Sequence, residues 1–379
     1  MENKEPIRIL IINGKMICGG VESFIMNIYR RIDRSKIQFD FLVHYKERFF
    51  YDDEIEKLGG KIYRLSFRND NRFFKYKKDL KLFFKEHKEY KIVWGQMDGL
   101  MSVYLKQAKK YGNNVITIAH SHIAGAEKSL KGLIKRFFKK GVGKVADYRF
   151  ACSTEAGKYL YGKKDFKIFP NAIDTKKFDF SQEKREKIRK EFSLPSNAFV
   201  IGHVGRFNEQ KNHEFLIKIF NEVVKKDERA VLMLCGDGEL KEKISMQVNA
   251  LNLQDRVIFV GNVNNVNEFY SAFDVFVMPS LYEGLPVSGI EAQTSGLKCL
   301  FSDTITKETQ LVVENVYFKS IKASPSEWAE KIISISVYKR ESKRLEVAKT
   351  GYDVYDEISK LENFFWSLAN ENETQTNNK

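Results

Sequence analysis

The chain has 379 residues, 43% of them hydrophobic and 30% charged, and at about 100–200 residues per domain this length predicts two domains with separate cores. With 6 prolines and 23 glycines, the composition excludes collagen-like and Pro/Gly-rich low-complexity chains. The 4 cysteines are far apart and form no CxxC pair, which argues against a disulfide scaffold or a cysteine zinc site and fits a reducing compartment.

No stretch approaches the roughly 18 consecutive apolar residues that a membrane-spanning helix requires. The apolar run at 7–12 is too short and too broken for a signal peptide, and we interpret it as a buried strand. The net charge of +14 is unevenly distributed, because residues 1–170 hold 36 Lys and Arg against 19 Asp and Glu, and the remainder holds 28 against 31. A basic first half predicts an anionic partner there: nucleic acid, an anionic membrane surface or a phosphorylated substrate.

Apolar, strand-like segments alternate with helical patterns along nearly the whole chain. We expect strands at 7–12, 39–43, 61–65, 92–94, 115–119, 149–152, 167–169, 199–203, 231–235, 257–260, 275–278, 298–301 and 316–318. This alternation indicates βαβ units and parallel sheets, so the sequence predicts two doubly wound α/β domains joined near residues 171–195. Ligands of such sheets bind beyond the carboxyl ends of the strands, which makes the residues after each strand the candidates for function.

Two turns in the first half carry candidate residues. The first strand is followed by a turn that contains Gly19 and Gly20 and leads into a helix, which suits a phosphate loop about as well as a plain turn. After the strand at 115–119 come His120 and His122, which we expect to point to opposite sides of the segment and so to make a poor chelating pair. We therefore predict no metal site, and expect His120 either to hydrogen-bond at the mouth of a cleft or to be a structural histidine.

Two cations follow the first strand of the second half. Arg206 and Lys211 come after Gly205, on either side of a turn and beside the expected start of a helix. Arg offers a planar fork of donors and Lys a point charge, so the pair suits a diphosphate. A solvated loop would explain either cation alone, but it explains both at this place less well.

The most specific motif is Pro279-Ser-Leu-Tyr-Glu-Gly-Leu-Pro286-Val-Ser-Gly-Ile-Glu291, in which a strand ends, a loop turns and a helix begins near the second proline. A carboxylate at Glu291 can accept both hydrogens of a vicinal diol such as a ribose. Its apolar neighbours predict that it is partly buried and needs a partner. Glu283, in the loop, is either a ligand contact or a carboxylate that the helix dipole favours.

Together these motifs resemble the retaining glycosyltransferases of family 4, which have the GT-B fold. The resemblance spans nearly the whole chain and rests on Gly19-Gly20, Pro170-Asn171-Ala172-Ile173-Asp174, Gly205-Arg206 with Lys211, Gly236-Asp237-Gly238, and the Glu-x7-Glu motif of Glu283 and Glu291. Within the family the chain looks most similar to bacterial capsule and exopolysaccharide transferases. Two departures from the family pattern, Ser295-Gly296-Leu297-Lys298 and Val287-Ser288-Gly289-Ile290, lie near the implied sugar pocket.

The resemblance implies an α/β fold of two Rossmann-like domains that face each other across a cleft. Residues 1–172 would form an acceptor-binding domain and residues 173–350 a domain that binds the nucleotide-sugar. Residues 351–369 would form a helix that packs back on the first domain. The polar segment 370–379 is expected to be a disordered tail.

The resemblance also implies the reaction: a UDP-linked sugar donor, a lipid-linked saccharide or oligosaccharide acceptor, and no metal or other cofactor. It assigns the donor diphosphate to Arg206 and Lys211, the ribose to Glu291 and the donor sugar to Glu283. The other implied donor-binding or catalytic residues are Gly19, Gly20, Gly284, Leu285 and His120, with the choice between His120 and His122 open. Cations and helix N-termini would stabilise the leaving diphosphate, and the departing phosphate would take the acceptor proton in a same-face attack.

Two segments of the basic first half, 72–91 and 127–141, have lysines interleaved with phenylalanine and leucine. Such a helix can lie on anionic lipid, although a core-facing helix with a solvated basic back has the same pattern. A lipid-linked acceptor favours the first interpretation, and with it a cytoplasmic protein bound peripherally to the inner face of the plasma membrane.

Three other functions fit parts of the sequence. A sugar-nucleotide epimerase or hydrolase could have the same architecture, but the Glu-x7-Glu spacing favours transfer. A nucleic-acid-binding protein would explain the basic charge, but no such motif is recognisable and the aromatic residues fall at helical spacing. An inactive sugar- or nucleotide-binding relative is disfavoured because Arg206, Lys211, Glu283 and Glu291 occur together.

Overall fold

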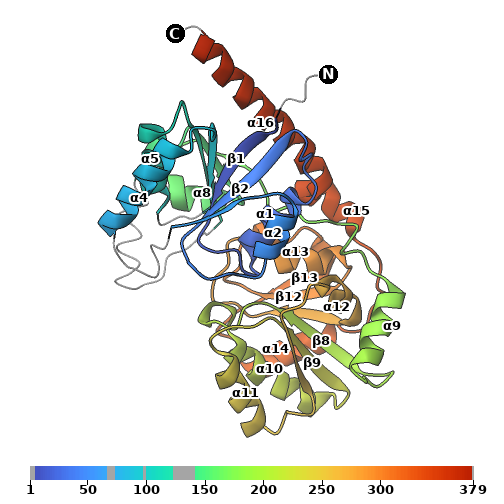
Figure 1. Cartoon of the computed structure of the whole chain (residues 1–379). Coiled ribbons are helices and arrows are strands. Elements are labelled where there is room, and N and C mark those ends of the chain that lie inside the picture. The colour runs from blue at the N-terminus through green and yellow to red at the C-terminus, as the bar shows by residue number, and fades with distance from the viewer. Residues whose placement is uncertain (1–4, 66–72, 97–99, 123–140, 378–379) are drawn as a thin grey trace. The chain divides into compact units, whose positions relative to one another are not determined.

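The computed structural model of the chain describes residues 5–65, 73–96, 100–122 and 141–377. The chain divides into two compact units, unit 1 with Met1–Asn171 and Val354–Lys379, and unit 2 with Ala172–Asp353. Each unit contains one parallel sheet with helices packed on it (Figure 1). The predicted class of two doubly wound α/β domains is therefore confirmed.

The sheet of unit 1 has the strand order β3-β2-β1-β4-β5-β6-β7. Its strands are β1 Ile7–Ile12, β2 Ile37–Val43, β3 Ile62–Arg64, β4 Ile92–Gly95, β5 Ile116–Ser121, β6 Tyr148–Ala151 and β7 Lys167–Ile168. Its helices are α1 Gly20–Tyr29, α2 Asp52–Lys57, α4 Phe73–Glu86, α5 Met101–Tyr111, α7 Val142–Val145, α8 Thr154–Tyr161 and α16 Val354–Asn377. β1 and β2 are almost entirely buried, as expected for parallel strands covered on both faces.

The C-terminal helix α16 belongs to the core of unit 1. Its residues Leu361, Phe365 and Leu368 are buried there, and the Phe365 ring packs on Phe39 and Trp94. The helix continues to Asn377, so residues 370–377 are helical where the sequence predicts a disordered tail. Extending an existing helix costs little, because each added residue gains a hydrogen bond without a new nucleation step.

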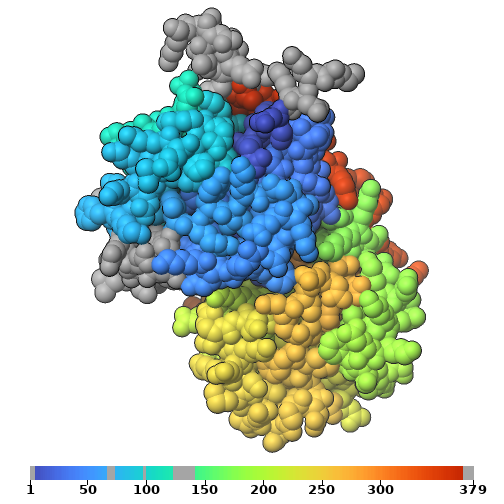
Figure 2. Space-filling view, viewed as in Figure 1, coloured from blue at the N-terminus to red at the C-terminus, as the bar shows by residue number. Residues whose placement is uncertain are grey.

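Unit 2 repeats this topology with the strand order β10-β9-β8-β11-β12-β13. Its strands are β8 Phe199–Val204, β9 Ala230–Cys235, β10 Val257–Gly261, β11 Val275–Met278, β12 Lys298–Ser302 and β13 Val316–Lys319. Its α-helices are α9 Gln182–Glu191, α10 His213–Lys226, α11 Lys241–Ala250, α12 Val266–Ala272, α13 Val287–Thr294, α14 Pro325–Ser334 and α15 Arg344–Val347. In the space-filling view, residues of unit 2 from the middle of the chain appear in green, yellow and orange (Figure 2).

Each predicted strand corresponds to a strand of the structure, with ends that differ by two residues or fewer. The predicted basic helix at 127–141 lies almost wholly outside the described residues, as do residues 378–379 of the predicted tail. Within the described residues, no helix is both long enough and apolar enough to span a membrane.

Candidate active site

The strand order of unit 2 reverses between β8 and β11, which pair directly with each other. The loops that follow the two strands are joined at the carboxyl edge of the sheet. The backbone N–H of Leu281 donates to the carbonyl of Gln210 (2.8 Å), and Asn212 Nδ2 donates to the carbonyl of Pro279 (3.1 Å). This switch point is where doubly wound sheets bind their ligands.

Lys211 and Glu283 form an ion pair at this edge. Lys211 Nζ lies 2.7 Å from Glu283 Oε1, and the two side chains are only 15% and 8% exposed. Gln210 Nε2 donates to the other carboxylate oxygen, Glu283 Oε2, at 2.9 Å. Two predicted site residues that follow different strands, β8 and β11, are thus in contact. Each carboxylate oxygen of Glu283 has a polar partner.

Arg206 lies at the same edge but in a different environment. Its guanidinium is about half exposed and contacts Glu239, with Nη2 at 3.1 Å from Oε2. An exposed ion pair of this kind contributes about 0–1 kcal/mol, so the guanidinium can turn to a ligand at small cost. The stem of Lys211 runs over Gly205, where a Cβ atom would lie 3.1 Å from Lys211 Cδ. The absence of a side chain at Gly205 therefore leaves room for the Lys211 stem.

Glu291 lies on α13, is buried, and accepts a hydrogen bond from the Tyr270 hydroxyl to Oε2 at 2.8 Å. Burial raises the pKa of Glu291 to about 7, against the opposing effects of this hydrogen bond and of the Lys177 charge. The preceding turn contains half-buried Gly284 and buried Leu285. Pro286 is the N-cap of α13 and offers no side-chain cap, so the first N–H groups of this helix have no capping side chain.

We predict that Glu291→Gln stabilises the ligand-free protein above pH 7. Burial on folding raises the pKa of the carboxyl from its ordinary value of 4.5 to about 7, so between these values the folded protein binds more protons than the unfolded chain. The free energy of unfolding must then fall as pH rises through this window, by an amount on the order of 3 kcal/mol that is fully lost above pH 7. Glutamine does not titrate, so the melting temperature of the variant should exceed that of the wild type at pH 8 and match it near pH 4. Parallel pH profiles for the two proteins would contradict this.

In unit 1, the prediction that His120 and His122 point to opposite sides is wrong. Side chains alternate along a strand with a period of two, so residues i and i+2 share a face, and the two ring centroids are 4.1 Å apart. The two rings nevertheless have separate hydrogen-bond partners. His120 Nε2 contacts the carbonyl of Phe169 (3.1 Å), whereas His122 contacts Asn171 Oδ1 (3.1 Å) and Gln96 Oε1 (2.6 Å).

The two histidines differ in their distance from the edge of the sheet. His120 lies within β5, fully buried between Phe24 and the stacked indole of Trp94. His122 lies just beyond the end of β5, beside Gln96, which follows β4. Burial lowers the pKa of both, to about 3 for His122, so both rings are neutral. A neutral ring has one N–H, so one of the two amide partners of His122 must present its NH₂ group.

Gly19 and Gly20 lie at the start of α1, as N-cap and first helical residue. The carboxylate of Glu22 folds back over this turn, since Oε1 accepts from Asn13 Nδ2 (3.0 Å) and Oε2 lies 2.5 Å from where a Gly19 Cβ would be. A carboxylate therefore already lies at the positive end of the α1 dipole. This favours the plain-turn interpretation over a phosphate loop.

Sequence reasoning did not single out Gln96, Gln210 or Tyr270. Gln96 directly follows β4, and Gln210 lies between Arg206 and Lys211. Their positions in the sequence could therefore have marked them as candidate site residues. Tyr270 lies on a different helix from Glu291, 21 residues earlier, and no local pattern links the two. In the described part of the chain, no group of three or more His, Cys, Asp or Glu side chains could hold a metal ion.

Comparison with known proteins identifies the family. Residues 184–353 match the model for glycosyl transferases group 1, and residues 18–177 match that for glycosyltransferase family 4. The putative glycosyltransferase EpsF of Bacillus subtilis (strain 168) is 31% identical over 374 residues, which cover 96% of this chain and 97% of the relative. The chain belongs to glycosyltransferase family 4. It is therefore a retaining, metal-independent glycosyltransferase that uses a nucleotide-sugar donor, and the predicted family is confirmed.

Two further proteins are similar to this family 4 enzyme, one in part of its sequence and one in its structure. The UDP-Gal:alpha-D-GlcNAc-diphosphoundecaprenol alpha-1,3-galactosyltransferase of Escherichia coli is 33% identical over 139 residues, 36% of each chain. The crystal structure of Anabaena HepE in complex with UDP and glucose aligns with a TM-score of 0.78, over 95% of this chain and 100% of that chain, at 17% identity. The structural likeness confirms the GT-B fold.

Proposed function

We propose that this enzyme transfers a sugar, with retention, from a UDP-linked donor to a lipid-linked saccharide during the assembly of a bacterial surface polysaccharide. The observation that carries the donor assignment is the Lys211–Glu283 pair at the switch point of unit 2, in the unit that also buries Glu291. The assignment to UDP is supported by the partial similarity to a galactosyltransferase named for UDP-Gal and by a structural neighbour bound to UDP. The lipid-linked acceptor is supported by the same galactosyltransferase, whose named acceptor is a diphosphoundecaprenol-linked sugar.

In this proposal, Arg206 and Lys211 bind the donor diphosphate. Arg206 can leave its exposed ion pair with Glu239 at little cost, and Lys211 is already held at the edge by Glu283. The uncapped N-terminus of α13, which follows Gly284 and Leu285, adds N–H donors and a positive dipole. Glu291 then binds the ribose hydroxyls and Glu283 contacts the sugar.

The chemistry assigned to these groups is stabilisation of the leaving diphosphate. Charge that develops on the diphosphate is met by the cations and N–H groups that already bind it. Glu283 is poorly suited to be a nucleophile, because one of its oxygens is in an ion pair and the other accepts from Gln210. We therefore adopt the same-face attack, in which the departing phosphate oxygen takes the proton of the acceptor hydroxyl.

Unit 1 is proposed to bind the acceptor. Of the two candidate histidines we assign sugar contact to His122, because His120 is fully buried in the aromatic core. A sugar hydroxyl would take the place of the Gln96 or Asn171 amide at this neutral imidazole, which needs no desolvation of a charge.

The proposal is tested by UDP release from UDP-glucose and UDP-galactose, with and without polyprenyl-diphosphate-linked N-acetylglucosamine. Release that requires the acceptor and yields an extended, lipid-linked product is the expected result. Equal release without acceptor would instead make the protein a hydrolase. Release from neither UDP-sugar, by a folded protein that turns over a GDP- or ADP-sugar, would refute the assignment to UDP.

Peripheral membrane binding is proposed from the outer face of α4. Phe74 is 86% exposed and Leu82 55% exposed. At 100° per residue, they share one face of the helix with exposed Lys78, Lys81 and Lys85. Apolar side chains flanked by cations are typical of helices that lie on anionic lipid, and the likeness to a transferase with a lipid-linked acceptor supports the same conclusion.

We predict that the protein floats with vesicles of phosphatidylglycerol at low ionic strength and is released by salt. Replacing Phe74 by serine and Lys78 and Lys85 by glutamate should abolish most of this binding. A control with the same charge change on an exposed helix of unit 2, at Lys225 and Lys226, should bind as the wild type does. Absence of the wild-type protein from the floated fraction would contradict the proposed membrane binding.

A further inference from the structure

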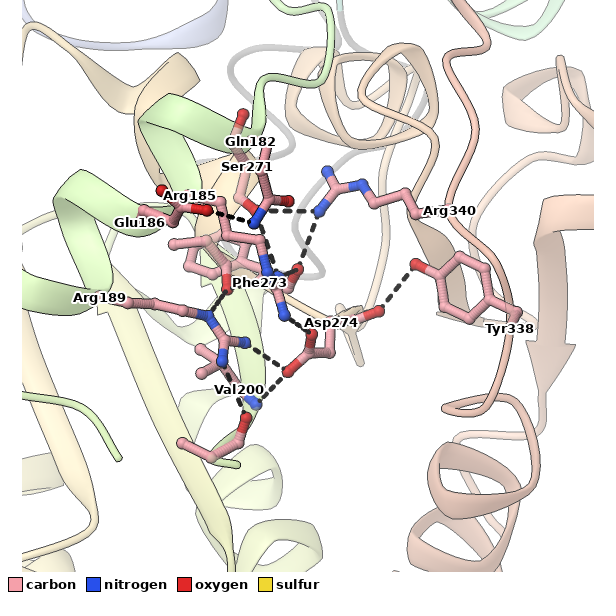
Figure 3. A network of polar contacts seen from close by, with 12 residues as sticks. Gln182, Arg185, Glu186, Arg189, Val200, Ser271, Phe273, Asp274, Tyr338 and Arg340 are labelled. Atoms are coloured by element: carbon pink, nitrogen blue, oxygen red, sulfur yellow. Dashed lines mark hydrogen bonds and ion pairs between the residues drawn. The ribbon is translucent and has the colours of Figure 1, made fainter. Parts of the chain in front are cut away.

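One side chain, Arg340, joins the C-terminal ends of α12 and α13, the helices that carry Tyr270 and Glu291. Figure 3 shows its guanidinium directed at the end of α12, next to the cluster around Asp274. Its acceptors are the carbonyl oxygens of Tyr270 (2.8 Å), Ser271 (3.1 Å), Phe273 (2.9 Å) and Ser295 (2.7 Å) and the hydroxyl of Ser295 (2.5 Å). Arg340 thus binds carbonyl groups that the last turn of α12 leaves without partners in the helix, together with the residue that ends α13.

The chemistry of arginine suits this position. Burial lowers the pKa of Arg340 to about 10, so the guanidinium stays charged at neutral pH, and it lies 4.3 Å from the centre of the Phe180 ring. The acceptors lie at helix C-termini, where the helix dipole favours a cation. Lysine has a single point charge on a flexible stem and cannot bind acceptors on two helices in this fixed arrangement.

Gly296, just after α13, allows the segment that carries Arg340 to approach this helix closely. Gly296 has φ +72°, and a Cβ atom there would lie 1.9 Å from the carbonyl oxygen of Glu341. A side chain at this position would therefore push away the segment that carries Arg340. Both residues of the Ser295-Gly296 pair serve this contact: Ser295 supplies two acceptors and Gly296 the space.

Tyr270 connects this arrangement to the donor site. Its ring packs on Phe178, Phe273 and Phe276 at centroid distances of 5.8–5.9 Å, and its hydroxyl donates to Glu291 Oε2. Because the ring is fixed on α12, the position of the hydroxyl depends on where α12 lies relative to α13. Arg340 binds both helices at their C-terminal ends and so connects α12 to α13.

We propose that Arg340 and Tyr270 are positioning residues for the donor: Arg340 fixes α12 against α13, and Tyr270 then orients the Glu291 carboxylate for the nucleotide ribose. This rests on the ribose-binding role proposed above for Glu291. Neither residue is assigned contact with the substrate, so their effects should appear in nucleotide affinity.

The first test is Tyr270→Phe, which keeps the ring and removes the hydroxyl. The Kd for UDP, measured by calorimetry, should rise about tenfold, and kcat at saturating donor should stay within about twofold. The hydroxyl stabilises the charged carboxylate, so its loss should also move the acid limb of the UDP-affinity profile to higher pH. The other groups that act on this pair are the Lys177 charge and the buried thiols of Cys235 and Cys299, whose pKa values burial raises. An unchanged Kd and pH profile would overturn the proposal.

The second test compares Arg340→Gln with Arg189→Gln. Arg189 belongs to the same cluster, where it donates to the carbonyl of Ala272 (3.1 Å) and to Asp274 (2.7 Å), but its described hydrogen bonds include none to α13 (Figure 3). Both variants should lower the melting temperature, but only Arg340→Gln should raise the Kd for UDP about tenfold. In the Tyr270→Phe background, Arg340→Gln should add little to the Kd. Equal changes of the Kd for UDP in the two arginine variants would show that Arg340 has only a structural role.

Two further variants keep the test decisive. If Arg340→Gln does not fold, Ser295→Ala removes a single acceptor of Arg340 and should raise the Kd about two- to threefold; an unchanged Kd counts against the proposal. Glu291→Ala separates this inference from the function on which it rests. If Glu291→Ala leaves UDP binding intact, the ribose assignment fails. If it weakens UDP binding but the Tyr270 and Arg340 variants do not, only the positioning inference fails.

Discussion

Replacing Lys211 by alanine should lower kcat/KM for the UDP-sugar donor by about 10²–10³-fold, with most of the loss in kcat. The reason is that this cation lies at the switch point of unit 2, where we propose that the diphosphate leaves, and its interaction would grow as charge develops on the leaving group. Steady-state kinetics over a range of donor concentrations measures both parameters.

Two control variants show whether this loss is specific to the Lys211 cation. Lys225→Ala removes an exposed lysine of α10 that pairs with Glu222 and should leave the kinetics unchanged. Lys211→Ala also leaves the Glu283 carboxylate without its ion pair, so the double variant with Glu283→Gln shows how much of the loss is due to that unpaired charge. If Lys211→Ala retained full turnover at saturating donor, the diphosphate assignment would be wrong.

The second large effect is expected at Glu291. Glu291→Ala should weaken UDP binding by about 10–100-fold, because a buried carboxylate that binds hydroxyl groups contributes strongly to affinity. It should also abolish discrimination between UDP and 2′,3′-dideoxy-UDP, which the wild type should bind much more weakly than UDP. Calorimetry with both nucleotides measures the affinity and the discrimination together.

The matched control is Glu330→Ala, which removes a mostly exposed carboxylate of α14 in the same unit. It should keep both the affinity for UDP and the preference over the dideoxy analogue. A Glu291→Ala variant that still prefers UDP over the analogue would show that another group reads the ribose.

Much of the fold could be predicted because its strands are short apolar runs bounded by turn residues. The runs at Ile7–Ile12 and Val275–Met278 are both examples, and their bounds are the same in the structure. Helix ends were less predictable, as α16 shows by continuing to Asn377 through polar residues. The segment near residues 171–195, where the two domains were predicted to join, contains helix α9, which Ser181 caps by accepting from the N–H of Lys184 (3.3 Å).

The candidate site could be predicted only in parts. Arg206, Lys211, Glu283 and Glu291 follow strands in recognisable motifs, so local sequence identified each of them. The contact between Lys211 and Glu283 depends on β8 lying next to β11, and strand order is not visible in a local pattern. The roles inferred for Tyr270 and Arg340 depend on contacts across 21 and 70 residues, for which the sequence offers no signal.

The central claim is that unit 2 binds a uridine nucleotide through Lys211 and Glu291. Its most direct test is the melting temperature of the wild type and of Glu291→Ala with UDP, GDP, ADP and CMP, since a ligand at 100 times its Kd adds about 2.7 kcal/mol of stability. We expect a rise with UDP alone in the wild type and a much smaller rise with UDP in the variant, whose Kd for UDP is expected to be about 10–100 times higher. A rise with GDP alone, or no rise with any nucleotide, would contradict it.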